Sequence, residues 1–245
     1  MYSFDSVVRY SEVDERGRLG IAALLNYLQD CSSFQSESLG VGVAHSAQVH
    51  RRWLLAAWEV EIARLPRFAD PIVVSTWATG FRGLFAGRNF TVRDAAGEEL
   101  VRADSLWFMY DDATGKPMRT PAEEITPYQH DLDNDERLPM PPIQRRIPVE
   151  GPGEAATPVV VSAAHIDTNH HVNNAQYVSL ALGVLPEGAG EAVRRLDVQY
   201  CAAARLGDTI YPRVHDVEGG HVVSLADAGG APYAVVRVRG CAGAE

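Results

Sequence analysis

The stretch HIDTNHHVNNAQYV, residues 165–178, is an unusual cluster of polar side chains that runs directly into an apolar segment. The imidazole of His171 can transfer a proton near neutral pH, and the amide of Asn169 can donate a hydrogen bond to an oxygen or hold a water molecule. The carboxylate of Asp167 can orient a neighbouring group or act as a base. Together these three groups suit acid–base chemistry on a carbonyl carbon, with stabilisation of the developing oxyanion.

This stretch has two other possible interpretations, a metal site and a helix cap. Residues 165–171 read H-x-D-x-x-H-H, and imidazole and carboxylate are ligands for zinc or iron. The stretch lacks a helical i, i+4 pair of histidines and further ligands, so we predict no metal and no cofactor. Asn173 and Asn174 suit a helix cap, and the helix that begins there would also offer backbone N–H groups to an oxyanion.

A second polar turn precedes an apolar helical segment near the start of the chain. SEVDERGRLGIAALLNYLQD, residues 11–30, aligns with the stretch above so that Asp14 meets Asp167 and Arg18 meets His171. Two more pairs of segments match in the same order, and together the three matches indicate an internal duplication. These are residues 58–70 with 196–208, and residues 92–100 with 225–233.

The two polar turns differ in the groups that could do chemistry. RGR at 16–18 stands where NHH stands at 169–171, so at most one copy carries the full set. The contrast points to the second copy, in which Asp167, Asn169 and His171 are the candidates considered above, and His165 and His170 are given no role.

Each half is predicted to contain one long helix followed by antiparallel strands. In the first half, alternation of apolar and polar residues predicts strands at 53–63, 71–81, 87–94 and 99–110. No second helix lies between them that could connect parallel strands. The pattern indicates an α+β fold in which a helix packs on an antiparallel sheet.

The two halves are separated by a connector in which proline recurs throughout residues 120–158. Proline lacks the backbone donor that a central strand needs, so we expect an extended connector. Its acidic run, DLDNDE at 131–136, is expected to be solvated. The predicted domains are residues 1–146, which include the first part of this connector, and residues 147–245.

Composition narrows the class of protein. The formal net charge of −10 argues against a nucleic-acid binder. No apolar run approaches the roughly 18 residues that span a membrane, and the N-terminus does not resemble a secretory signal. Cys31, Cys201 and Cys241 are too widely spaced for a disulfide framework, which favours the cytoplasm. Exposed sheet edges make a homodimer a further expectation.

Residues 167–177, D-T-N-H-H-V-N-N-A-Q-Y, resemble the D-x-N-x-H-V-N-N-x-x-Y motif of plant and bacterial acyl-ACP thioesterases. Weaker similarities, among them QDCSS at 29–33 and ADSLWFMYD at 103–111, extend through most of the chain. The resemblance implies two tandem hot-dog units, each a long helix packed on an antiparallel sheet. It also implies hydrolysis of fatty acyl–acyl carrier protein thioesters to free fatty acid and holo-ACP, with Asp167, Asn169 and His171 as catalytic residues.

The same resemblance implies acyl carrier protein as the partner. Because that carrier is acidic in this family, an arginine patch is expected to receive it. The candidates are Arg145, Arg146, Arg194, Arg195 and Arg205.

One position departs from the family pattern. Where the family usually places a glutamate, this chain has Ala203, and the adjacent cysteine position is Ala204. Gln199 or Cys201 would share a strand face with Ala203 and could supply a polar group, although Cys201 is expected to be a small buried residue. Ala203 favours one alternative, a degenerate acyl-binding protein that does not catalyse. An acyl-CoA thioesterase is a second alternative, because the same chemistry serves either carrier, and a hot-dog dehydratase is a less favoured third.

Overall fold

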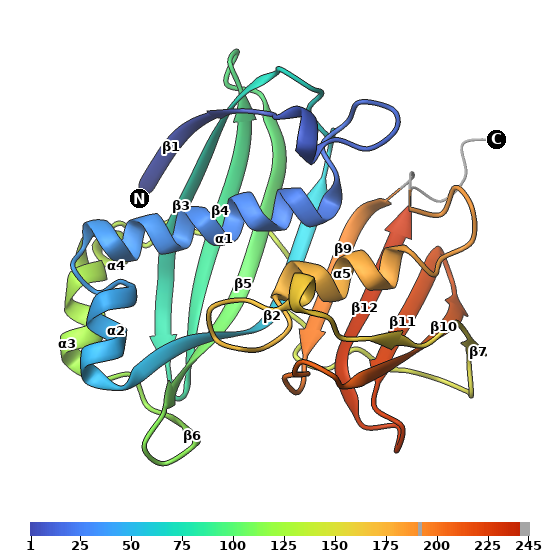
Figure 1. Ribbon diagram of the computed structural model, residues 1–245. Coiled ribbons are helices and arrows are strands. Elements are labelled where there is room, and N and C mark those ends of the chain that lie inside the picture. Colours follow the sequence, from blue (N-terminus) through green and yellow to red (C-terminus); the bar gives the residue numbers. More distant parts are fainter. Residues whose placement is uncertain (191–192, 241–245) are drawn as a thin grey trace. The chain divides into compact units, whose positions relative to one another are not determined.

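A computed structural model describes residues 1–190 and 193–240 of the chain (Figure 1). The fold divides into two compact units, one formed by residues 1–56 and 62–143 and the other by residues 57–61 and 144–245. The domain boundary at residue 146 stays a prediction. No described helix is both long enough and apolar enough to cross a membrane. Cys31 and Cys201 are free thiols, and Cys241 lies outside the described residues.

The first unit is an antiparallel sheet with one long helix laid across it (Figure 1). Its strands follow the order β1-β3-β4-β5-β2, with β6 paired to β5. The elements are β1 (Tyr2–Val7), η1 (Tyr10–Glu12), α1 (Ile21–Ser38), α2 (Val43–Val49), β2 (Arg51–Ile62), β3 (Pro71–Arg82), β4 (Phe85–Asp94), β5 (Glu99–Asp111), β6 (Lys116–Met118), α3 (Ala122–Ile125), η2 (Thr126–Tyr128) and α4 (Gln129–Asn134). All four predicted strands are confirmed, with ends that differ by at most two residues.

The second unit repeats this plan with shorter elements. Residues 57–61 of β2 begin the strand order, which continues as β9-β12-β11-β10-β7, and β8 pairs with β10. The remaining elements are β7 (Glu154–Ala155), β8 (Val159–Val160), η3 (Ala163–His165), α5 (Asn174–Leu182), β9 (Val193–Tyr200), β10 (Thr209–Val217), β11 (Gly220–Ala226) and β12 (Pro232–Gly240). Helix α5 packs against β11 and β12 and buries its apolar side chains there. The α+β class with one principal helix on each sheet is confirmed.

The prediction of an extended connector is wrong for residues 122–134, which form α3, η2 and α4. Proline does not prevent these helices because of where it stands. Pro121 is the N-cap of α3, and Pro127 lies in the first turn of η2, where a backbone N–H has no partner within the helix. The prolines therefore fix helix starts.

The acidic run is also not uniformly solvated. Asp131, on α4, is only 4% exposed. Its Oδ2 accepts hydrogen bonds from the side chain of Gln35 at 2.8 Å and from the backbone N–H of Ala78 at 3.0 Å. This carboxylate ties α4 to both α1 and β3, which corrects the expectation for Asp131.

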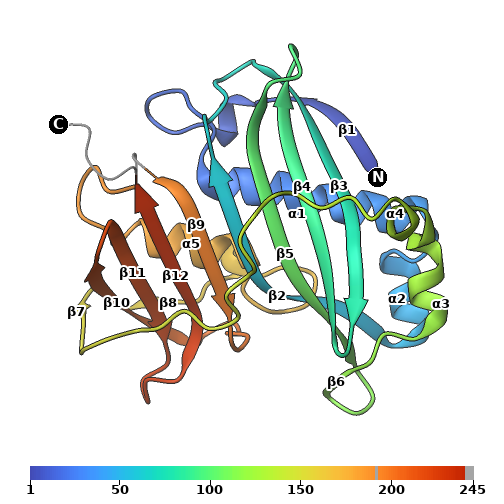
Figure 2. The ribbon, with the colours of Figure 1, turned by 180° about the vertical axis from the view of Figure 1, so that it is seen from behind.

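Beyond α4 the chain crosses the face of the first sheet that points away from α1 (Figure 2). The indole N–H of Trp77 donates to the carbonyl oxygen of Glu136 at 2.8 Å, and the N–H of Leu138 donates to Oδ1 of Asn89 at 3.0 Å. Asn89 in turn donates to Asp104 at 3.0 Å. Burial raises the pKa of Asp104 to about 6.

Candidate active site

The three predicted site residues lie together on one closed turn between η3 and α5. The N–H of Asp167 donates to the carbonyl oxygen of His171 at 2.9 Å, and the N–H of His170 donates to the carbonyl oxygen of Asp167 at 3.0 Å. Ile166 and Val172 close the turn as a β-bridge. Residues 166–172 are called the motif turn below.

Within the motif turn the three candidate side chains have different environments. Asp167 and His171 are half-buried, whereas Asn169 is exposed. Oδ1 of Asp167 accepts the backbone N–H of Asn169 at 2.8 Å. The Asp167 carboxylate therefore fixes the backbone of Asn169, while the Asn169 amide makes no side-chain hydrogen bond to the part of the chain that the structure describes.

Helix α5 begins directly after the motif turn, as the sequence predicts. Oδ1 of Asn173 accepts the N–H of Ala175 at 2.9 Å, so the capping interpretation of Asn173 is confirmed. The N–H of Gln176 donates to the carbonyl of Asn173, and that of Val172 donates to the carbonyl of Ala204. The N–H groups of Ala175 and Gln176, in the first turn of α5, are therefore already bonded within the chain, whereas the Asn169 amide is exposed.

The turn at 13–19 in the first unit has the same backbone hydrogen bonds. The N–H of Asp14 donates to the carbonyl oxygen of Arg18 at 2.7 Å, and the N–H of Gly17 donates to that of Asp14 at 2.9 Å. Gly17 has φ +70°, and His170 has φ +61° at the equivalent position. The internal duplication read from the sequence is thus present in the backbone geometry.

The 3-10 turns that precede the two turns also match. In the first unit, Oε2 of Glu12 accepts the N–H of Arg9 at 2.8 Å. In the second unit, Nδ1 of His165 accepts the N–H of Ser162 at 3.1 Å. Because Nδ1 is the acceptor, the neutral ring carries its proton on Nε2. His165, which the sequence left without a role, holds the chain that enters the motif turn.

The two turns differ in their side chains. Nε of Arg18 donates to Oδ2 of Asp14 at 3.1 Å, so an ion pair neutralises the carboxylate of the first turn. The second turn has His171 in place of that arginine. Because both turns fold with the same hydrogen bonds, the shape of the turn does not require the asparagine and histidine of the second copy.

Two tyrosines that the sequence interpretation did not use connect α5 to β9 and to the loop that follows β9. The hydroxyl of Tyr177 accepts the N–H of Ala204 at 2.8 Å, and that of Tyr200 donates to the carbonyl of Asn174 at 3.0 Å. Their ring centroids are 6.1 Å apart. Burial raises the pKa of Tyr177 to about 12 and raises that of Tyr200, so both stay neutral near pH 7. The available signal was the position of Tyr177 within the motif.

Gln199 and Cys201, the two residues considered as substitutes for the missing glutamate, do not stand in for it. Gln199 is on the face of β9 opposite Tyr200, and its Oε1 accepts the N–H of Ile147 at 2.8 Å. Cys201 lies beyond β9 and is exposed, so the prediction that it is buried is wrong. The N–H groups of Cys201 and Ala202 both donate to the carbonyl of Tyr233, which breaks the alternation that would have placed Cys201 on the face of Gln199. Ala203 is exposed and carries no acid.

The five candidate arginines are not equivalent. Arg195 forms ion pairs with Glu59, Glu61 and Asp197, so its charge is already balanced within the second unit. Arg205 is exposed and follows Ala204, which is bonded to the motif turn. Among residues 1–190 and 193–240, no group of three or more histidine, cysteine, aspartate or glutamate side chains is arranged to hold a metal ion.

Family models match both units of the chain. The acyl-ACP thioesterase N-terminal domain matches residues 1–128, and the acyl-ACP thioesterase C-terminal domain matches residues 154–227, which include the motif turn. The chain belongs to the acyl-ACP thioesterase family. The resemblance inferred from the sequence is confirmed.

Individual thioesterases show how far the similarity extends. A chloroplastic acyl-[acyl-carrier-protein] hydrolase of Cuphea viscosissima is 27% identical over 195 residues, which are 73% of this chain and 45% of the relative. The crystal structure of an acyl-ACP thioesterase from Bacteroides thetaiotaomicron superposes with a TM-score of 0.88 at 27% identity, covering 97% of this chain and 96% of that one. The 12:0-ACP thioesterase from Umbellularia californica shares the fold, with a TM-score of 0.81 at 19% identity over 97% of this chain and 96% of its own. The chain spans about half the length of the curated relatives it matches.

Proposed function

We propose that this protein hydrolyses fatty acyl–acyl carrier protein thioesters to a free fatty acid and holo-ACP. One observation carries the proposal beyond family membership. The two turns share their backbone hydrogen bonds, but only the motif turn has Asn169 and His171, at the positions of Arg16 and Arg18. Folding alone does not account for these two residues, whereas hydrolysis uses both.

In the proposed reaction the exposed Asn169 amide donates a hydrogen bond to the carbonyl oxygen of the thioester, and it stabilises the oxyanion when water adds. The neutral imidazole of His171 takes a proton from the attacking water. When the tetrahedral intermediate collapses, the C–S bond breaks and the imidazolium returns the proton to the leaving thiolate. Asp167 positions Asn169 through the bond from its N–H to Oδ1.

Because Ala203 cannot act as an acid or a base, we assign the proton transfer to His171. Acyl-CoA is the close alternative substrate because it presents the same thioester. A non-catalytic acyl-binding protein is the competing class, and the observation in its favour is that Ala203 is chemically inert. We further propose a cytoplasmic location on the basis of the cysteine spacing, and a homodimer stays a prediction.

The test follows thiol release from acyl-ACP and acyl-CoA of several chain lengths. We expect the wild type to release thiol, and His171→Ala and Asn169→Ala each to lower kcat by about a hundredfold or more. Arg18→Ala, at the equivalent position of the first turn, is the matched control and should keep the wild-type rate. Enoyl and hydroxyacyl thioesters in the same panel would reveal a dehydratase.

No release from any substrate by the wild type would contradict hydrolysis and favour acyl binding. Equal rates in wild type and His171→Ala would leave hydrolysis standing and remove His171 from the mechanism. An effect of Arg18→Ala as large as that of His171→Ala would show that the losses come from folding.

A further inference from the structure

A hydrogen-bonded turn at Arg205–Asp208 directly follows Ala204, which is bonded to the motif turn. The N–H of Arg205 donates to Oδ2 of Asp208 at 2.8 Å, and the N–H of Asp208 donates back to the carbonyl of Arg205 at 3.0 Å. The preceding residue, Ala204, accepts the N–H of Val172 at 2.9 Å. Arg205 therefore directly follows a residue whose backbone is hydrogen-bonded to the motif turn.

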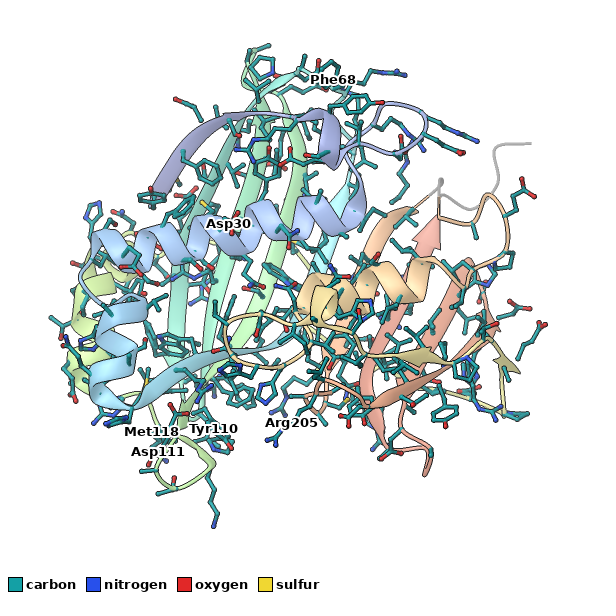
Figure 3. The ribbon with its side chains drawn as sticks, viewed as in Figure 1. Asp30, Phe68, Tyr110, Asp111, Met118 and Arg205 are labelled. Carbon is teal, nitrogen blue, oxygen red and sulfur yellow. The ribbon has the colours of Figure 1, made fainter. Side chains whose placement is uncertain are left out.

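The first two side chains of this turn face the solvent. Arg205 is exposed, and Leu206 is 65% exposed (Figure 3 labels Arg205). Within the described residues the guanidinium of Arg205 makes no ion pair, in contrast to Arg195. A fixed turn thus presents a free cation and an uncovered branched apolar side chain next to each other, beside the motif.

We propose that Arg205 and Leu206 form a subsite for the phosphopantetheine arm of the substrate. This inference rests on the proposed hydrolysis, since it concerns the part of the substrate that enters the site from solvent. In the arm, a phosphate ester is attached to a carbon next to a quaternary carbon with two methyl groups. The adjacent cation and isobutyl group of the turn match this adjacent anion and apolar group.

Arginine suits this role because its planar guanidinium stays charged and binds phosphate oxygens in pairs. The chain as a whole carries a formal charge of −10, which opposes the approach of an anionic substrate. A local unpaired arginine offsets that repulsion where the arm must pass. Because the contact is exposed, its contribution to binding should weaken as salt is raised.

The first unit contains the same turn at Arg67–Asp70. The N–H of Arg67 donates to Oδ2 of Asp70 at 2.8 Å, and the N–H of Asp70 donates to the carbonyl of Arg67 at 3.0 Å. Its second residue, Phe68, packs edge-on against Tyr10 with ring centroids 5.9 Å apart (Figure 3 labels Phe68). This copy follows Pro66, which is bonded to the first turn through Leu19.

The first turn lacks the motif asparagine and histidine, so Arg67 is a matched control for Arg205. Both arginines are exposed, both begin the same hydrogen-bonded turn, and neither makes an ion pair within the described residues. They differ in which of the two turns they adjoin. The spacing R-x-x-D at 67–70 and 205–208 is the sequence signal of this pair.

The experiment measures kcat and KM for one acyl chain carried on ACP, on CoA and on pantetheine, which lacks the phosphate. We expect Arg205→Ala to raise KM about fivefold for acyl-ACP and acyl-CoA, with kcat unchanged, and to leave KM for acyl-pantetheine at the wild-type value. Arg67→Ala should leave every constant unchanged. Arg205→Lys, which keeps the charge and loses the paired geometry, should fall between wild type and Arg205→Ala.

Three outcomes would overturn the subsite. Unchanged KM values in Arg205→Ala, with an active wild type, would remove Arg205 and leave the proposed hydrolysis intact. An equal rise for acyl-pantetheine would mean that Arg205 acts on the motif turn. A rise for acyl-ACP alone would assign the contact to the protein surface of the carrier.

A binding measurement separates the subsite from catalysis. Titration calorimetry with 4′-phosphopantetheine should give about fivefold weaker binding to Arg205→Ala than to wild type, and equal binding to Arg67→Ala. Suppose that the wild type hydrolyses none of the thioesters, and that this difference in binding is still found. Then the proposed function fails and the subsite stands. If the wild type hydrolyses thioesters but binds phosphopantetheine no better than Arg205→Ala, the subsite fails alone.

Discussion

The hydroxyl of Tyr177 accepts the backbone N–H of Ala204 at 2.8 Å, and Ala204 is completely buried. The carbonyl of the same alanine accepts the N–H of Val172. One residue of the loop after β9 is thus bonded on both sides, to α5 through Tyr177 and to the motif turn through Val172. The shape of the site depends on a phenol that does not take part in the proposed chemistry.

Tyr177→Phe should lower the free energy of unfolding by about 1 to 3 kcal/mol, because the buried N–H of Ala204 loses its partner while the ring volume is kept. Urea denaturation measures the change. Tyr200→Phe is the comparison, and it should cost less because the carbonyl of Asn174 belongs to a helix and has a second acceptor site. Equal losses in the two variants would contradict this account.

His170→Gly should leave hydrolysis unchanged and raise the free energy of unfolding by up to about 1 kcal/mol. His170 has φ +61°, a conformation that costs a side-chain-bearing residue energy and glycine almost none. His170→Val should instead lower the stability, because a branched residue tolerates positive φ poorly. Thermal unfolding and thiol release together check this, and loss of activity in the glycine variant would give His170 a role in the reaction.

Asn173→Ala should lower the free energy of unfolding by about 1 kcal/mol, because the N–H of Ala175 loses its cap at the start of α5. Asn173→Ser keeps a capping oxygen and should remain close to wild type. Denaturant midpoints at constant slope measure both variants. If serine and alanine destabilise equally, the cap does not hold the helix start.

The carboxyl group of Asp104 should make stability depend on pH between about 4 and 6. Burial raises its pKa to about 6, although the N–H of Ser105 and the charge of Arg137 act in the opposite direction. The folded state therefore binds this proton more tightly than the unfolded chain. The contribution of this tighter proton binding to the stability of the fold is fully present below about pH 4, and it is lost as pH rises towards 6.

Asp104→Asn removes that charge and keeps an oxygen that can accept from Asn89 and Ser105. At pH 7 the variant should be more stable by about 2 kcal/mol, and its stability should change less than that of wild type between pH 4 and 6. Urea titrations across this range give the comparison. A less stable variant at pH 7 would show that the carboxylate has a favourable partner there.

The sequence predicts the parts of this fold that depend on local patterns. Alternation gives the strands of the first unit, and residue types give the motif turn and the Asn173 cap. The ion pairs of Arg195 with Glu59 and Glu61 could not be predicted, because they require knowing that residues 57–61 lie beside β9. The burial of Asp131 likewise depends on how α4 docks against Gln35 and Ala78.

Cys201 shows how a local pattern fails. Period-two alternation assigns it to the face of Gln199, but β9 ends at Tyr200 and the next two N–H groups share one carbonyl. Nothing in the residue types marks that irregularity. The irregularity takes Cys201 out of the strand, whereas Gln199 stays in β9 with its Oε1 already bonded to the N–H of Ile147.

The turn at 13–19 shows that this backbone shape forms without the asparagine and histidine of the motif turn. It has an acidic acceptor at Asp14 and a glycine where φ is positive, and Arg18 balances its carboxylate. The other copy keeps the acid and departs at the remaining two positions, where it places His170 and His171. Under the proposed mechanism, substitutions in the first copy affect folding alone, whereas those in the second also affect hydrolysis. If the proposed mechanism holds, comparing the two copies separates, within one chain, the residues that the fold requires from those that the reaction requires.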